Sequence, residues 1–289
     1  MFQDMSNKDY HASPAISASW LKLLAKSPAH LWHAYINPDR TPSVPTAAMQ
    51  LGSLTHTLVL EPEKLDAEYA IIPEGIDKRS KDGKALFAEV EASGKTPIKQ
   101  SDYDHCLAMA TALRSNAQFC KLRQYKHSNE VTFTWDDEEF GLACKMRPDT
   151  VVHPCTAYGN GVLTDVKTTS DASPSGFGKQ FFALGYHIQA AHNAIGFMQA
   201  FGTDEPPVVI FECVEKDAPH LVMNYTVPLD VLEYGMRERD RLMAIAAQCF
   251  ETGIWPGYEG DMIVPPWIRR EMEESGEIEV EYVEETENE

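Results

Sequence analysis

Val162-Leu163-Thr164-Asp165-Val166-Lys167 is the stretch that decides the fold, because its β-branched and apolar residues predict a strand. Side chains two positions apart on a strand project to the same face, so Asp165 and Lys167 present a carboxylate and an ammonium at one spot. An Asp-x-Lys tripeptide alone is usually a same-face ion pair. Its chemistry therefore depends on what a neighbouring strand brings beside it.

The upstream segment Arg147-Pro148-Asp149 brings a second carboxylate. Residues 149–152 read as extended chain, and a short connection through Gly159 and Gly161 can return the chain beside them, so that the two aspartates meet. Two close carboxylates repel each other unless a cation lies between them, and oxygen ligands with open positions suit Mg²⁺ or Mn²⁺. The pattern predicts a metal site in which Lys167 can orient a water or stabilise its deprotonated form.

The sequence around these strands mixes extended and helical patterns. Residues 130–135 alternate at period two and 140–146 return after an acidic turn, which predicts a hairpin. Two further strands are predicted over 207–214 and 221–227. Helices are predicted over 47–60, 85–91, 101–113, 177–184, 186–201 and 229–252, with two short ones near residues 17–24 and 28–35. This order predicts one α/β domain with a catalytic core over about 47–252.

The composition is that of a globular chain, since 43% of the 289 residues are hydrophobic and 24% are charged. No apolar run approaches the roughly 18 residues of a membrane helix, and the first residues lack the pattern of a signal peptide. We expect a cytoplasmic protein with no membrane partner. The six cysteines form no C-x-x-C pair, which predicts reduced thiols and disfavours zinc and iron–sulfur sites.

The net charge of −19 is unevenly distributed. Residues 271–289 hold ten Glu and no Lys or Arg, so we predict a single domain over 1–270 and an acidic, disordered tail. Basic residues cluster at Lys78, Arg79, Lys81 and Lys84. Such a cluster is either an ordinary solvated face or part of a local basic groove for nucleic acid.

Four motifs in order resemble those of the PD-(D/E)XK nucleases, and within them the RecE-type (exonuclease VIII) and phage lambda-type 5′→3′ exonucleases. They are Gly52-x-x-x-His56, Arg147-Pro148-Asp149, Asp165-Val166-Lys167 and Tyr186-His187-Ile188-Gln189. Four ordered motifs are much harder to obtain by chance than one. The resemblance implies an α/β fold with a restriction-endonuclease-like core, in which helices flank a central mixed sheet. Lambda-type members have Glu in the place of Asp165.

The resemblance also implies the metal ligands. Asp149 and Asp165 would bind the ions, the Val166 carbonyl would add a ligand, and Lys167 would position the attacking water. His56 would help to bind a second ion, although a lone His on an apolar helix is more often a hydrogen-bonded core residue. Two Mg²⁺ ions are implied in each site, and Mn²⁺ should also support activity.

Further residues are implied in contacts with DNA. Tyr186 and Gln189 lie three apart on a helix and can both face the site, where Gln189 would touch the phosphate. Ser17 and Ser19 resemble a helix entry that holds the 5′-phosphate, and Arg147 is a second phosphate candidate. The simpler roles are an N-cap for Ser19, a packed aromatic for Tyr186 and a strand-end charge for Arg147.

One more acidic residue occupies a position that is often acidic in relatives. Glu130 can either hydrogen-bond near the site or simply begin a strand. We expect the second.

The implied function is a Mg²⁺-dependent exonuclease that starts at 5′-phosphorylated ends of double-stranded DNA and leaves 3′ single strands for recombination by strand annealing. A homotrimeric or homotetrameric ring around the DNA is implied, with the basic cluster in its lumen and a single-strand annealing protein as partner. Two alternatives stay open. One is a structure- or sequence-dependent endonuclease or RecB-like repair nuclease, and the other is a non-catalytic module that binds DNA ends or protein.

Overall fold

The computed structural model describes residues 3, 5–41, 45–77 and 79–275. The chain forms two compact units, Met1–Pro256 and Gly257–Glu289. The predicted tail over 271–289 begins within helix α12 (Pro266–Glu274) of the second unit, and its residues 276–289 lie outside the described part. The boundary at residue 270 stays a prediction. No helix in the described part is long and apolar enough to cross a membrane, and the six cysteines are free thiols.

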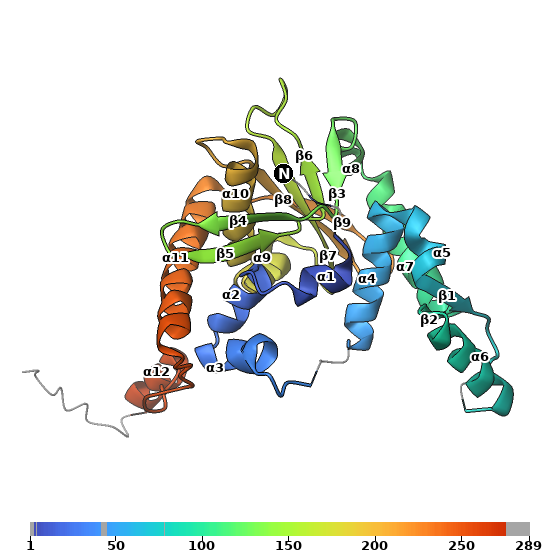
Figure 1. The fold of residues 1–289 in the computed structure, drawn as a ribbon, viewed down its shortest axis with the longest axis horizontal. Coiled ribbons are helices and arrows are strands. Elements are labelled where there is room, and N and C mark those ends of the chain that lie inside the picture. Colours follow the sequence, from blue (N-terminus) through green and yellow to red (C-terminus); the bar gives the residue numbers. More distant parts are fainter. Residues whose placement is uncertain (1–2, 4, 42–44, 78, 276–289) are drawn as a thin grey trace, which may run out of the picture. The chain divides into compact units, whose positions relative to one another are not determined.

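A mixed five-stranded sheet is the centre of the first unit, as predicted (Figure 1). Its order is β3-β6-β7-β8-β9, in which β7 and β8 are parallel and the other neighbours are antiparallel. The strands are β3 (His127–Asn129), β6 (Thr150–Val152), β7 (Val162–Thr169), β8 (Val208–Glu215) and β9 (Val222–Thr226). The stretch over residues 162–167 therefore lies in the central strand β7, which is hydrogen-bonded to β6 on one side and to β8 on the other.

Two smaller sheets accompany the central one. The predicted hairpin forms from β4 (Phe133–Asp137) and β5 (Leu142–Met146), but as a separate two-stranded sheet. The second pair was not predicted. It consists of β1 (Tyr69–Ile72) and β2 (Thr96–Lys99), which pair in parallel with each other, and helix α6 (Lys81–Ala92) lies between them in the sequence. We call residues 69–99 the arm. Figure 1 shows the arm to one side of the central sheet.

Helices of different lengths cover the sheets. The long helices are α4 (Ala47–Leu60), α7 (Gln100–Ser115), α9 (Pro174–Ala183), α10 (Tyr186–Phe201) and α11 (Leu229–Thr252). The short ones are α1 (Asn7–Ala12), α2 (Ala18–Leu24), α3 (Pro28–Leu31), η1 (Trp32–Ile36), η2 (Pro62–Lys64), α5 (Leu65–Glu68) and α8 (Ala117–Leu122). The predicted long helices are confirmed to within a few residues at each end.

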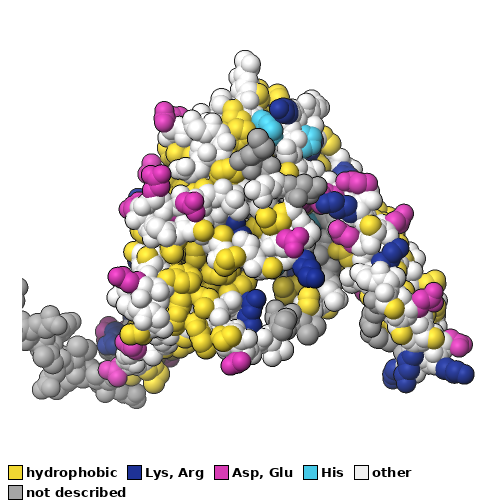
Figure 2. Space-filling view, viewed as in Figure 1, with side chains coloured by type: hydrophobic (Ala, Val, Ile, Leu, Met, Phe, Trp, Pro, Cys, Tyr) yellow, Lys and Arg dark blue, Asp and Glu magenta, His cyan; other side chains and the backbone are white. Residues whose placement is uncertain are grey.

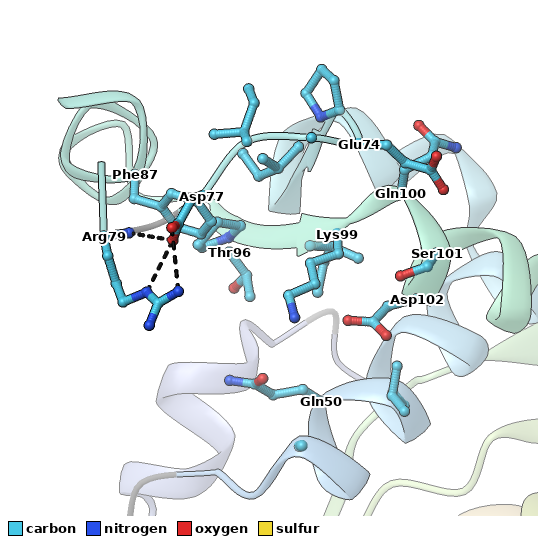
Figure 3. Close-up of a pocket in the computed structure, with 18 residues that line it drawn as sticks. Gln50, Glu74, Asp77, Arg79, Phe87, Thr96, Lys99, Gln100, Ser101 and Asp102 are labelled. Carbon is cyan, nitrogen blue, oxygen red and sulfur yellow. Dashed lines mark hydrogen bonds and ion pairs between the residues drawn. The ribbon is translucent and has the colours of Figure 1, made fainter. Parts of the chain in front are cut away.

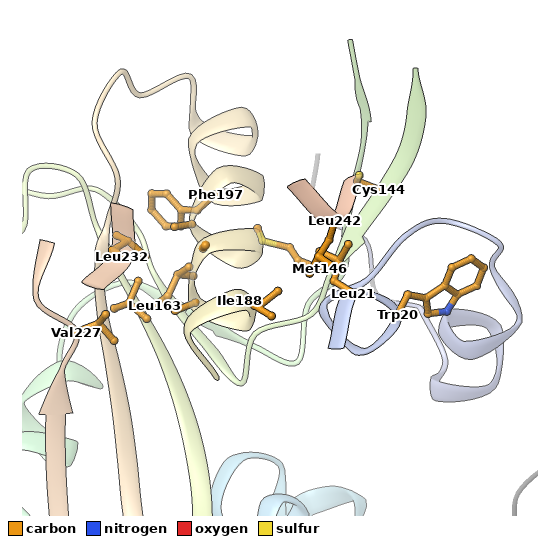
Figure 4. Packing of buried hydrophobic residues seen from close by; sticks show 14 of the residues in the cluster. Trp20, Leu21, Cys144, Met146, Leu163, Ile188, Phe197, Val227, Leu232 and Leu242 are labelled. Carbon is orange, nitrogen blue, oxygen red and sulfur yellow. The ribbon is translucent and has the colours of Figure 1, made fainter. Parts of the chain in front are cut away.

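The alternation of β7 sends its side chains into two different cores. Leu163 packs in the larger core with residues of α2, α10 and α11, part of which is shown in Figure 4. Val166 faces the opposite side and packs with residues of α4 and α7. Because both faces are covered by helices, β7 is held rigidly and its polar residues have fixed positions.

A buried polar network connects three strands of the central sheet, β6, β7 and β8. The Arg123 guanidinium, just after α8, forms an ion pair with Glu212 of β8, which is fully buried. It also donates to Thr150 of β6 over 3.1 Å and to Thr164 of β7 over 3.4 Å. The two threonines directly neighbour Asp149 and Asp165 in the sequence, so this network fixes the strands that carry the two aspartates.

Candidate active site

The two predicted aspartates lie side by side. β6 and β7 are antiparallel with Thr150 opposite Thr164, and one step further in this register brings Asp149 opposite Asp165. Both carboxylates are buried. The Val166 N–H donates to the Asp149 carboxylate over 2.5 Å, so the end of β6 is bonded directly to β7.

Asp165 is held by partners on its own strand and on α10. Its carboxylate forms an ion pair with Lys167 and accepts a hydrogen bond from the Gln189 side-chain amide. The Lys167 ammonium also lies 4.8 Å from the centre of the Tyr186 ring. Burial by itself would lower the pKa of Lys167, but the carboxylates of Asp165 and Asp149 outweigh burial and hold that pKa above its usual range. Lys167 is therefore an ammonium at neutral pH.

A second group of side chains forms around Asp149. Ligand atoms of His56, Glu130 and Asp149 all lie within 4.8 Å of one another. His56 Nδ1 is 3.4 Å from Asp149 Oδ2 and 3.9 Å from Glu130 Oε1. Burial alone would lower the pKa of His56, yet the two carboxylates raise it to about 10. The protonated imidazole thus neutralises part of the acidic charge.

This group fits a divalent cation. Two carboxylates and an imidazole are ligands that Mg²⁺ or Mn²⁺ accepts, and their ligand atoms lie close enough together to share one ion. The set differs from the predicted one, because Glu130 joins His56 and Asp149 while Asp165 turns to Lys167 and Gln189. The roles of Asp165 and of the Val166 carbonyl as ligands stay predictions.

The expectation that Glu130 begins a strand is wrong. Glu130 follows β3 in a bend with φ of 48°, a left-handed conformation that is uncommon for residues other than glycine. This bend, and not a strand, turns its carboxylate toward His56. The periodicity of residues 130–135 gave no sign of a local left-handed turn, whereas the acidic side chain next to a predicted hairpin was the available signal.

Two cavities open at this site. The acidic pocket has a volume of about 480 Å³ and is lined by His56, Glu61, Glu68 and Glu130, among others. The cationic pocket has a volume of about 290 Å³, and its polar lining includes Ser17, Ser19, Lys22, Arg147, Lys167 and Gln189. The structure thus brings the predicted phosphate residues together around one cavity beside Lys167, and their roles there stay predictions.

Lys22 is a member of the cationic pocket that the sequence analysis missed. Its ammonium donates to the Gln189 side-chain oxygen over 3.1 Å and lies 5.4 Å from the centre of the Tyr186 ring. Burial, with a further contribution from Lys167, lowers the pKa of Lys22 to about 8. The available signal was its spacing, because Ser19 and Lys22 are three apart on α2 and share a face.

Arg147 is already engaged by the N-terminal segment. Its guanidinium donates to the Thr132 hydroxyl over 2.9 Å and to the Met5 carbonyl over 2.6 Å. It also lies 4.3 Å from the centre of the Tyr10 ring. Arg147 lines both cavities, so a contact with phosphate is compatible with its position.

The basic cluster lies on the arm and makes no described contact with the aspartates. Lys78 lies outside the described residues, Lys81 and Lys84 are exposed, and Arg79 pairs with Asp77 (Figure 3). Figure 2 shows Lys and Arg side chains at the far end of the arm. A wider cavity of about 910 Å³ is lined by the arm and by the first residues of α4 and α7. It contains neither His56 nor either aspartate.

Comparisons with known proteins agree with this geometry. Residues 17–263 match the family described as PDDEXK-like domain of unknown function (DUF3799). A crystal structure described as a "putative exonuclease" from Eubacterium rectale has a TM-score of 0.60 and 15% identity, covering 96% of this chain and 100% of that one.

A second structure, that of SSO0001, has a TM-score of 0.30 and 15% identity and covers 68% of this chain and 86% of that one. That score carries no argument about the fold. No curated protein matches this chain.

Proposed function

Since this chain belongs to the family of PDDEXK-like domains, we propose that it is a divalent-metal-dependent nuclease that degrades double-stranded DNA from its ends in the 5′→3′ direction. The observation that carries the proposal is the pair of aspartates at the end of β6 and on β7, with an acid–imidazole group on one side and Lys167 on the other. The resemblance to RecE-type and lambda-type exonucleases adds the direction and the preference for ends.

The residues of this chain have distinct parts in the proposed reaction. A divalent ion held by His56, Glu130 and Asp149, with a second one near Asp165, would supply charge neutralisation and Lewis acidity for attack of water on a phosphodiester. The Lys167 ammonium would hold the water beside Asp165 and offset the charge that develops on the phosphate. Mg²⁺ is the proposed ion, and Mn²⁺ should replace it.

The cationic pocket supports the choice of an end over an internal site. Lys22, Arg147 and Lys167 line a small cavity next to the aspartates, and Ser17 and Ser19 add hydroxyl groups. Ser17 precedes α2, and its side chain makes no capping hydrogen bond there, so its hydroxyl is not committed to the helix. A 5′-phosphate, with its extra negative charge, is the ligand that such a cavity would prefer.

The proposal includes the assembly and the biological role that the resemblance implies. A ring of three or four copies would keep the enzyme on the DNA, and the exposed cations of the arm would face the duplex. The 3′ single strands would be passed to a single-strand annealing protein for recombination. Light scattering of the purified protein tests the ring, since a monomeric mass would exclude it.

A plasmid assay tests the activity. The protein is incubated with Mg²⁺ and either a closed circular plasmid or the same plasmid linearised with 5′-phosphorylated ends. We expect nucleotide release from the linear form, sparing of the closed form, and no release with EDTA. Loss of a 5′-terminal label before a 3′-terminal label gives the direction. Nicking of the closed plasmid would identify an endonuclease, and no metal-dependent release would identify a binding module.

A further inference from the structure

Three side chains separate the acidic pocket from the cationic pocket. Asn7, His11 and Arg147 line both cavities, so they lie between them. Asn7 and His11 are four apart on α1 and therefore share one face of that helix. The aspartates contact residues of both cavities, because Asp149 lies beside His56 and Asp165 lies beside Lys167. The face of α1 that carries Asn7 and His11 thus lies between the acidic pocket and the cationic pocket.

Two cations fasten the N-terminal segment over residues 5–13, namely Lys145 of β5 and Arg147, which follows β5. The Lys145 side chain is only 2% exposed, and its ammonium donates to the carbonyls of Tyr10 over 2.6 Å and of Ser13 over 2.8 Å. The Tyr10 ring has Lys145 at 4.6 Å and Arg147 at 4.3 Å from its centre. We call residues 5–13 the strap. A buried ammonium bound to two strap carbonyls holds the strap firmly, since losing those partners would leave the charge unpaired.

The strap lies outside the region shared with the family. The match begins at residue 17, whereas the strap ends at Ser13. The parts of both pockets that come from α2, α4, β7 and α10 lie within the match. Two of the three side chains between the pockets, Asn7 and His11, therefore precede the shared domain, whereas Arg147 belongs to it.

We propose that the strap makes cleavage depend on a free DNA end. This inference rests on the proposed nuclease function and assigns the requirement for an end to particular residues. A DNA strand that occupies both pockets must pass beneath the face of α1 that carries Asn7 and His11. A strand with an end can be threaded through this passage, whereas a closed circle cannot. Without the strap only Arg147 would remain between the two pockets, which would then form one groove that accepts an internal segment.

A variant that detaches the strap from the hairpin tests the proposal. Tyr10→Ala combined with Lys145→Met removes the ring that both cations contact and the ammonium that binds the strap, while Met fills the buried position. Lys8→Ala is the matched control, because Lys8 is exposed on the same helix and lines neither pocket. Hydrogen exchange of residues 7–13 measures release, and exchange of β7 and β8 reports whether the sheet stays folded. If β7 and β8 lose protection, Tyr10→Ala alone, which leaves Lys145 with its carbonyl partners, takes the place of the double variant.

The substrates are one closed circular plasmid and the same plasmid linearised with 5′-phosphorylated ends, each with Mg²⁺. The wild type and Lys8→Ala should cleave the linear form about 100-fold faster than the circle, and release should reduce this ratio at least about tenfold. An unchanged ratio after measured release would overturn the proposal. Equal cleavage of both forms by the wild type would also overturn it, yet leave the nuclease function standing. No cleavage of either form would overturn both.

Discussion

The backbone N–H of Val166 donates to the Asp149 carboxylate over 2.5 Å, so a residue of the candidate metal group is bonded to the strand that carries Asp165 and Lys167. Asp149→Asn keeps one oxygen for this bond, removes the charge and replaces the second carboxylate oxygen with an NH₂ group. We expect the variant to fold normally and to lose at least about 10³-fold in cleavage rate, measured with linear plasmid. Asp136→Asn, at an exposed position of β4, is the control. A rate near that of the wild type would remove Asp149 from the site.

Lys167 should contribute to both stability and cleavage. Lys167→Met leaves the buried Asp165 carboxylate without its ammonium, so the free energy of unfolding should fall by about 3 kcal/mol. Adding Asp165→Asn removes the buried charge, and stability should then recover to within about 1 kcal/mol while cleavage stays absent. Urea denaturation and the plasmid assay measure the two effects separately. Recovery of cleavage in the double variant would contradict the proposed roles.

Glu130 should determine how much metal the enzyme needs. Glu130→Gln removes one negative ligand from the group with His56 and Asp149, so the Mg²⁺ concentration for half-maximal cleavage should rise about tenfold. Glu61→Gln is a matched control, because Glu61 lines the same pocket but pairs with Lys64. A metal titration that is the same for Glu130→Gln and the wild type would place Glu130 outside the metal site.

Lys22 should favour DNA that carries a 5′-phosphate. Its ammonium lies in the cationic pocket, where a contact with a doubly charged phosphate is worth about 1.5 kcal/mol or more. Lys22→Ala should therefore reduce the preference for 5′-phosphorylated over 5′-hydroxyl ends about tenfold. Lys26→Ala, an exposed change just beyond the same helix, should leave the preference unchanged. Equal losses on both kinds of end would show that Lys22 does not bind the terminal phosphate.

His192 should make the fold sensitive to acid. The ring is fully buried, with Nε2 3.0 Å from the Lys145 carbonyl oxygen, and burial together with nearby Arg239 lowers its pKa to about 3. The unfolded chain takes up a proton near pH 6.5 and the folded chain does not. The contribution of this ring to stability is therefore complete above pH 6.5 and is lost as the pH falls toward 3, by roughly 1.4 kcal/mol per pH unit.

Urea denaturation at several values between pH 7 and pH 5 tests this dependence. His192→Leu should show a shallower loss of stability than the wild type over that range, because the other titrating groups are common to both proteins. Parallel curves would show that another group accounts for the acid sensitivity.

Local pattern was sufficient for the elements that build the centre of the fold. The β-branched and apolar residues of 162–167 predicted β7, the alternation in residues 130–135 with the return over 140–146 predicted the hairpin, and the apolar spacing predicted α10 and α11. The pattern did not predict that the hairpin forms a sheet of its own, because that depends on contacts between distant segments. Strands β1 and β2 have only four residues each, which is too short for a periodicity to be recognised in the sequence.

The candidate site was predictable where its residues share a strand or a short loop. Asp165 and Lys167 lie two apart on one strand, and Asp149 meets them through a short connection. Lys22 could not be placed in the same way, since its partner Gln189 is 167 positions away. The strap is a still harder case, because Lys145 binds it through backbone carbonyls, which carry no sequence signal.

The arm has a small core of its own, formed by Ile72, Phe87 and Val90. Its two strands are parallel neighbours, with Tyr69 opposite Thr96 and Ile72 opposite Lys99, so the first and the last residue of the arm lie at opposite ends of one short strand pair. Four residues of strand span roughly 10 Å, and any insert that replaced the arm would have to bridge that distance. An exchange of this kind, with the central sheet left as it is, would show whether the arm decides which nucleic acids are bound.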